Sequence, residues 1–254
     1  MNNSSDALFA PRLADMAERC RRDGCSVFSR FFDERQCAEA EQWCRYNAGD
    51  LQYGFFGGFS DARRRILAFY HDYSAEYITE ELPIVCLTFT FRNEDRLSHR
   101  DFLGSFMALK LKRDTIGDIV IKDGMAQAAV NETAARDITM SISKIGRTGV
   151  KITDSRPFEL TLAETEEFRE TSCTAASLRL DCIVAAAAKI SREKAAALIR
   201  SEKTEVNHLP VSSVSAELKE GDILSIRGCG RFILSGINGT TKKGRIHIIL
   251  KKYI

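Results

Sequence analysis

The sequence predicts an α+β protein built from three parts. Residues 78–158 contain β-branched and aromatic runs that alternate with helical patterns in the order β-α-β-β-α-β. Residues 175–254 predict two packed helices followed by a small sheet. Residues 1–77 predict an N-terminal helical or α/β segment, and the acidic, polar stretch 159–174 predicts a linker or edge element between domains.

The N-terminal segment begins with two predicted helices. Residues 8–22 place apolar side chains at helical spacing, and residues 33–46 fit a second helix with Asp33 as its N-cap. The stretch "LQYGFFGGF" (51–59) alternates glycine with aromatic residues, so we expect a turn or bend there. Residues 65–70 predict the strand that follows.

The middle part opens with a strand and a helix and continues with a hairpin. "LPIVCLTFTF" (82–91) predicts the strand, and residues 98–111 predict a helix that Ser98 caps. Asp123-Gly124 joins the apolar runs "GDIVI" and "AQAAV". This dipeptide is a strong hairpin signal, because a type I′ turn needs positive φ at both of its central residues.

The middle part ends with a second helix and a last strand. Asn131 is expected to cap a helix that runs to about Ile145, and "GVKIT" (149–153) predicts the strand. The complete order is that of a ferredoxin-like sheet, which RNA-recognition motifs share. This order predicts a topology and leaves the function open.

The C-terminal part predicts two consecutive helices. Residues 177–189 form the first, and Ser191 caps the second, whose small alanines allow the helices to pack closely. Four strand runs follow, namely "TEVNH", "DILSIRG", "RFILSGI" and "RIHIIL".

The composition of the 254 residues is that of a globular protein. No stretch approaches the roughly 18 apolar residues of a membrane span, and the first residues lack the continuous apolar core of a signal peptide. We therefore expect a cytoplasmic protein without a membrane partner.

The cysteines and histidines do not have metal-site spacing. The eight cysteines form no CxxC pair, and the four histidines do not cluster with them. A zinc site usually takes its ligands in close pairs. We expect reduced thiols, no metal and no cofactor.

The charge is distributed unevenly along the chain. Residues 172–254 carry 14 Lys and Arg against 7 Asp and Glu, a net charge of +7. The remaining 171 residues carry 23 against 28, a net charge of −5. A basic module on an acidic body is typical of a polyanion-binding protein, although a solvated basic face gives the same count.

The helix at Ser191 has two interpretations. The N–H groups of its first turn lack helical partners and can bind a phosphate, with Arg192 and Lys194 adding donors. It can equally be an ordinary capped helix with two exposed basic residues. Other basic and polar residues surround it in sequence and are candidate RNA contacts: Arg179, Lys203, Asn207, Arg227, Arg231, Lys242, Lys243 and Arg245.

The C-terminal part resembles the S4 RNA-binding domain. The resemblance is carried by "SLRLDCIVAAAAKISREKAAALIRSEKTEVNHLPV" and "LKEGDILSIRGCGRF", and it implies that Ser191, Arg192 and their basic neighbours bind RNA phosphates. Two positions depart from the pattern. Lys203 stands where the family usually has glycine, so we expect a strained or remodelled turn there, and His208 stands where "VNG" is common.

The resemblance extends over nearly the whole chain. "FFDERQ", "FGGFSDARRRIL", "HRDFLGSFMALKLKRDTIGDIVI" and "TKKGRIHI" are similar to the YlmH family of bacterial S4 proteins. The resemblance implies an RNA-binding middle domain and ribosome association. It further implies work on the large subunit with peptidyl-tRNA, in rescue of stalled translation. The RNA partners would then be rRNA and also tRNA, and we expect a monomer.

Signals for catalysis are weak. His99-Arg100-Asp101 resembles part of a kinase catalytic loop, but Phe106 stands where the metal-binding Asn belongs. In "RLDCIV", Asp181 is expected to orient Arg179 or to cap the helix. We therefore expect no catalytic residues and no enzyme. An RNA-modifying enzyme similar to pseudouridine synthases and a protein–protein adaptor stay open as alternatives.

Overall fold

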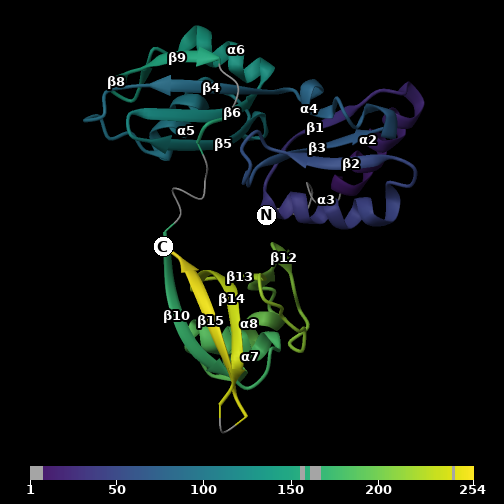
Figure 1. The fold of residues 1–254 in the computed structure, drawn as a ribbon, viewed down its shortest axis with the longest axis vertical. Helices are drawn as coiled ribbons and strands as arrows, with labels where there is room; N and C mark the ends of the chain where they lie inside the picture. Colours follow the sequence, from purple (N-terminus) through teal and green to yellow (C-terminus); the bar gives the residue numbers. More distant parts are fainter. Residues whose placement is uncertain (1–7, 155–157, 161–166, 242–243) are drawn as a thin grey trace. The chain divides into compact units, whose positions relative to one another are not determined.

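The structure, a computed structural model, describes residues 8–154, 158–160, 167–241 and 244–254. The chain divides into two compact units, Met1–Thr165 and Glu166–Ile254. The segments predicted for residues 1–77 and 78–158 both lie within the first unit (Figure 1). The predicted α+β class is confirmed.

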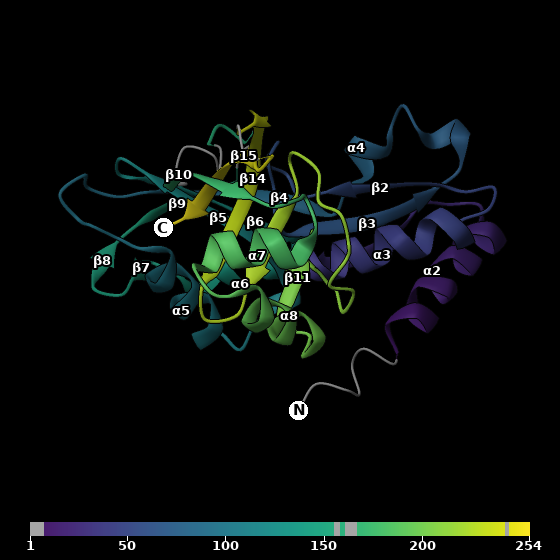
Figure 2. The same ribbon diagram turned by 90° about the horizontal axis from the view of Figure 1, so that it is seen from below.

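The N-terminal part of the first unit is a three-stranded antiparallel sheet, ordered β1-β3-β2, against which two helices pack (Figure 2). Both predicted helices and the strand over residues 65–70 are confirmed. The elements are α2 (Phe9–Asp23), β1 (Val27–Phe32), α3 (Glu34–Asn47), β2 (Gln52–Phe56) and β3 (Arg65–Tyr70), followed by a 3₁₀ turn (Asp72–Ser74) and α4 (Ile78–Glu81).

Two local features of this sheet bear on the sequence predictions. The predicted cap is confirmed, because the Asp33 carboxylate accepts a hydrogen bond from the Gln36 N–H at 2.8 Å. The Gln36 side-chain oxygen in turn accepts one from the Asp33 N–H at 3.1 Å. The prediction of a turn over residues 51–59 is wrong for the first half of this stretch, which forms β2. Gly54 lies within that strand, where a Cβ would come 2.8 Å from the Phe56 ring, so glycine there makes room for a ring rather than for a turn.

The second part of the first unit is a four-stranded antiparallel sheet ordered β5-β6-β4-β9. The predicted β-α-β-β-α-β order is confirmed, and its core lies between this sheet and its helices. The elements are β4 (Ile84–Thr90), α5 (His99–Ala108), a 3₁₀ turn (Arg113–Thr115), β5 (Ile116–Lys122), β6 (Met125–Asn131), α6 (Glu132–Ser141), β7 (Lys144–Ile145), β8 (Thr148–Gly149) and β9 (Lys151–Asp154).

The turns of this sheet decide where its elements end. Asp123 and Gly124 have φ of +45° and +77°, as the predicted type I′ hairpin requires. Both helices end earlier than expected. Lys110 takes a left-handed φ of +61°, which stops α5, and the small hairpin of β7 and β8 uses the residues that were expected to extend α6.

The second unit is a six-stranded sheet ordered β10-β15-β14-β13-β11-β12 with two helices packed on it (Figure 1). The predicted pair of helices and the four strand runs are confirmed, although the first helix begins three residues later than expected. The elements are β10 (Phe168–Ala175), α7 (Leu180–Ala188), α8 (Arg192–Arg200), β11 (Thr204–Val206), β12 (Leu209–Pro210), β13 (Ile223–Ile226), β14 (Gly230–Thr240) and β15 (Ile246–Tyr253).

Residues 168–174 of the stretch predicted as a linker or edge element form an edge strand, whereas residues 161–166 of that stretch lie outside the described residues. Strand β10 pairs with β15 without interruption from Phe168 opposite Tyr253 to Ala175 opposite Ile246. It is an edge strand with mostly exposed side chains, so its sequence lacks the apolar alternation of a half-buried strand. Its backbone pairing extends the second unit by several residues towards the N-terminus.

The strained turn predicted at Lys203 lies one residue earlier, at Glu202, which has φ of +53°. A second left-handed pair follows at Asn207 and His208, with φ of +49° and +69°. The family departure at His208 therefore falls at a position that favours glycine. Among the residues that the structure describes, no helix is long and apolar enough to cross a membrane.

Candidate nucleic-acid interface

The centre of the candidate interface is a buried carboxylate that holds two arginines. Asp181 lies in the first turn of α7, and its side chain is only 6% exposed. Its Oδ1 accepts from Arg179 Nε at 3.2 Å, and its Oδ2 accepts from Arg192 Nε at 2.8 Å. The Arg179 side chain is 37% exposed and that of Arg192 57% exposed. The prediction that Asp181 orients Arg179 is therefore confirmed, and it orients Arg192 as well.

The two arginines also set the charge state of this carboxylate. Burial raises the pKa of Asp181, but the hydrogen bonds from Arg179 and Arg192 outweigh burial and leave the pKa below its usual value. The hydrogen bond between Arg192 and Asp181 also raises the pKa of Arg192. One carboxylate thus serves two guanidinium groups, and a positive charge is left at the surface.

Ser191 caps α8, as predicted. Its Oγ accepts the Lys194 N–H at 3.3 Å, while the Lys194 side chain is exposed. This long bond uses one of the donors of the first turn. Arg192 and Lys194 remain at the surface beside the helix N-terminus, so the geometry is compatible with both interpretations of this helix.

Two other predicted cations are neighbours across a pair of strands. The Arg227 N–H donates to the Lys203 carbonyl oxygen at 2.9 Å, at the point where β11 begins and β13 ends. Both residues are exposed. The structure therefore brings Lys203 and Arg227 together, although 24 positions separate them in the sequence.

Asn207 has a role inside the fold. Its amide nitrogen donates to Asp222 at 2.9 Å, and its amide oxygen accepts the Ile223 N–H at 2.9 Å. The Asp222 carboxylate in turn accepts the Lys219 N–H at 2.7 Å. The Asn207 side chain thus fixes the start of β13, and an RNA contact would have to share these atoms.

The remaining predicted contacts lie along β14 and β15. The Arg231 guanidinium stacks 5.5 Å from the centre of the Tyr253 ring. The exposed Arg245 donates to Thr174 Oγ1 at 3.0 Å and to its carbonyl oxygen at 2.8 Å. Lys242 and Lys243 lie outside the described residues.

Sequence reasoning missed three cations of this unit. Arg169, Lys189 and Lys252 border one cavity, together with the turn that follows Arg227. The alternation of side chains along β10 and β15 could have placed Arg169 and Lys252 on one face, had the strand β10 been expected.

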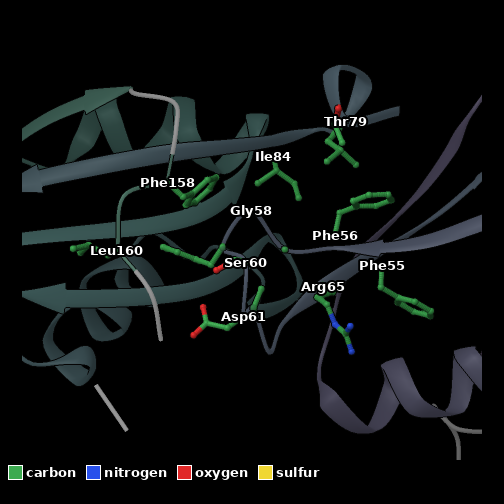
Figure 3. Close-up of a pocket in the computed structure, with 14 residues that line it drawn as sticks. Phe55, Phe56, Gly58, Ser60, Asp61, Arg65, Thr79, Ile84, Phe158 and Leu160 are labelled. Atoms are coloured by element: carbon green, nitrogen blue, oxygen red, sulfur yellow. The ribbon is translucent and has the colours of Figure 1, made fainter. Parts of the chain in front are cut away.

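The first unit contains a larger cavity (Figure 3). Its volume is about 860 Å³, and side chains from three segments converge on it, including Phe56, Ile84 and Phe158. Gly58, with φ of +89°, lies against the Phe158 ring, which a Cβ there would approach to 2.3 Å. The aromatic residues around Gly58 thus line a cavity as well as contributing to the core.

His99, Arg100 and Asp101, which resemble part of a kinase catalytic loop, form the first turn of α5. The Asp101 carboxylate accepts from the Ser98 N–H at 2.8 Å and from its hydroxyl at 2.6 Å, which lowers the pKa of Asp101. Asp101 is therefore half of a capping box. Within the described part of the chain, His, Cys, Asp and Glu side chains form no group that could hold a metal ion.

A ferredoxin-like sheet joined to a basic unit that holds arginines at its surface has the chemistry of a polyanion-binding protein. Residues 87–159 match the family model described as "Putative RNA-binding domain in YlmH". A relative from Bacillus subtilis (strain 168), named Ribosome-associated protein quality control protein P2, is 32% identical over 209 residues, which cover 80% of this chain and 79% of the relative. The chain belongs to the YlmH family, as its sequence motifs indicated.

A solved structure has a similar fold. The structure of Cell division protein ylmH from Streptococcus pneumoniae matches with a TM-score of 0.52 and 16% sequence identity. The match covers 61% of this chain and 94% of that chain.

Proposed function

We propose that this chain is a non-catalytic RNA-binding protein that binds structured RNA on the ribosome. Its second unit would act as an S4-type module with rRNA, and tRNA, as ligands. The observation that carries the proposal is the pair Arg179 and Arg192, which the buried Asp181 holds at the surface of a basic unit. Forked guanidinium groups that are fixed in place bind phosphate oxygens well.

The particular setting that we propose is the large ribosomal subunit with peptidyl-tRNA, during rescue of stalled translation. The name of the Bacillus subtilis relative, Ribosome-associated protein quality control protein P2, supports this setting. It implies a cytoplasmic protein, and we propose that it acts as a monomer.

Charge reversal at the helix start tests the RNA site. The double variant Arg192→Glu, Lys194→Glu should lose most co-sedimentation with large subunits. Because Arg192→Glu also removes a donor from the buried Asp181, the single variant Lys194→Glu at an exposed position should lose part of the co-sedimentation at an unchanged melting temperature. Wild-type binding should weaken steeply as salt rises, because each neutralised phosphate releases counterions.

The matched control reverses two exposed helical arginines outside residues 87–159, Arg19→Glu and Arg45→Glu, and should bind as wild type. Unchanged sedimentation of the Arg192 and Lys194 variant would overturn the site. Association that resists high salt would instead favour the protein–protein adaptor.

The non-catalytic part of the proposal has its own test. Asp101 is occupied by its capping hydrogen bonds, which supports a structural role. A strain that carries Asp101→Asn should keep its rRNA modification pattern and its growth under translational stress. A lost modification would instead indicate an RNA-modifying enzyme.

A further inference from the structure

The second unit contains a cavity, called here the β10–α7 cavity, at one end of its helix-and-sheet sandwich. Its volume is about 360 Å³, within the roughly 300–1,000 Å³ of small-molecule sites. Strand β10, the C-terminal end of α7, the turn before β14 and the strand β15 surround it. Its apolar lining includes Ala186, Ala187, Cys229, Phe232 and Leu250.

Three cations from three different elements border this apolar lining. Arg169 comes from β10, Lys189 follows the last turn of α7, and Lys252 comes from β15. All three are exposed, and none has an ion pair with an acidic side chain in the part of the chain that the structure describes. The neighbouring Glu170 belongs by strand alternation to the other face of the sheet, where it is in register with Lys251. The β10–α7 cavity thus has unneutralised positive charge at its border.

Two details show how the cations are held. The Lys252 ammonium lies 5.6 Å from the centre of the Phe232 ring, so the charge stands over the aromatic lining. Lys189 occupies the left-handed position at the end of α7, with φ of +54°. Glycine is the usual residue at such a position, so a lysine there keeps its charge at a cost in backbone strain.

An apolar cavity with a cationic border fits a ligand that has a flat apolar body and attached negative charge. We propose that the β10–α7 cavity binds a nucleotide, with the base beside Cys229 in the half-buried part of the lining and the phosphate at Arg169, Lys189 and Lys252. Such a nucleotide can be an unstacked residue of an RNA chain or a free mononucleotide. The RNA form rests on the proposed function, and it adds a preference for RNA that has an unpaired nucleotide, because bases inside a duplex stay stacked.

The test compares two RNA hairpins that differ only in one bulged adenosine. Wild-type protein should bind the bulged hairpin about five- to tenfold more tightly, which is near the lower limit for one bound base because no open aromatic face is available for stacking. The double variant Lys189→Gln, Lys252→Gln should remove most of this preference. Lys251→Gln makes the same change on the other face of β15 and should keep it.

A second variant fills the cavity without changing charge. Cys229→Phe should abolish the preference for the bulge while it leaves affinity for the paired hairpin unchanged, which also shows that the variant is folded. If Cys229→Phe does not fold, the lysine variants still decide the question. A wild-type preference that survives in Lys189→Gln, Lys252→Gln would overturn the inference.

Adenosine monophosphate distinguishes the two sources of the nucleotide. If it binds wild type but not the lysine variant, and the two hairpins bind equally, the cavity takes a free nucleotide. Equal binding of both hairpins without nucleotide binding overturns the cavity assignment and leaves the proposed RNA-binding function intact. Failure to bind either hairpin or large subunits overturns the proposed function instead.

Discussion

Each unit of the molecule has a buried aspartate beside two arginines. The two aspartates differ in the groups that donate hydrogen bonds to them. In the second unit, the Asp181 carboxylate accepts directly from the guanidinium groups of Arg179 and Arg192. In the first unit, Asp118 is 7% exposed, and its carboxylate accepts backbone N–H groups, from Arg63 at 2.7 Å and from Arg64 at 2.9 Å.

The guanidinium groups of the first unit bind carbonyl oxygens. Arg64 Nε donates to the Ile116 carbonyl oxygen at 3.0 Å, and its Nη2 donates to those of Phe31 and Arg113 at 3.3 Å. Arg113 donates to the same Ile116 oxygen at 2.6 Å. Burial lowers the pKa of Arg113 to about 10, with a further contribution from the Arg64 charge. Arg64 thus joins the two sheets of the first unit, whereas Arg179 and Arg192 face outwards.

The largest effect is expected where an arginine holds the fold together. Arg64→Ala removes three hydrogen bonds from a half-buried guanidinium group to carbonyl oxygens, so we expect a loss of about 3 kcal/mol in the free energy of unfolding of the first unit. Trp43, the chain's single tryptophan, packs against Phe69 in this unit and reports its unfolding by fluorescence. Arg136→Ala, on an exposed face of α6, should cost less than about 0.5 kcal/mol. Equal stability of the two variants would contradict the distinction between the clusters.

The next effect tests whether Asp181 aims its two arginines. Asp181→Asn removes the charge that both guanidinium groups share, and we expect a loss of about 2 kcal/mol from the second unit. RNA affinity should also fall although no cation has been removed, because the arginines lose their fixed position. Amide hydrogen exchange of α7 and α8 measures the stability, and filter binding measures the affinity. Glu193→Gln is the matched control at an exposed position of α8. If both variants have similar stability and RNA affinity, Asp181 does not position the two arginines.

The two aspartates should respond to pH with opposite sign. The pKa of Asp181 lies below its usual value, so its contribution is complete above about pH 4 and is lost as the pH falls through the folded-state pKa. Burial raises the pKa of Asp118 above its usual value, so its contribution is complete below about pH 4 and is lost as the pH rises through the folded-state pKa. Each effect is the difference between wild type and the corresponding Asn variant, measured by hydrogen exchange from pH 3 to pH 7. Slopes of the same sign would contradict these directions.

These clusters also show what the sequence could and could not predict. Local signals were read correctly, since the Asp123-Gly124 hairpin and the Asp33 cap depend on residues adjacent in the chain. The stretch that forms β10 could be predicted only as a linker or edge element, because an edge strand with exposed side chains has no apolar alternation. The sequence does not reveal the partners of Arg64, because they come from segments 33 to 52 residues away. Which arginine supports the fold and which faces a ligand therefore depends on tertiary contacts.

The smallest effect concerns the left-handed turn at Asn207 and His208. His208 has φ of +69°, a conformation that costs a residue with a Cβ about 1 kcal/mol. His208→Gly should therefore stabilise the second unit by up to about 1 kcal/mol, less whatever contact the imidazole makes. Asn207→Gly is the matched control, because it relieves the same kind of strain at φ of +49° but removes the amide bonds to Asp222 and Ile223. We expect this variant to be less stable than wild type, and thermal unfolding of both proteins measures the contrast. Destabilisation by His208→Gly would show that the histidine side chain contributes more than its backbone costs.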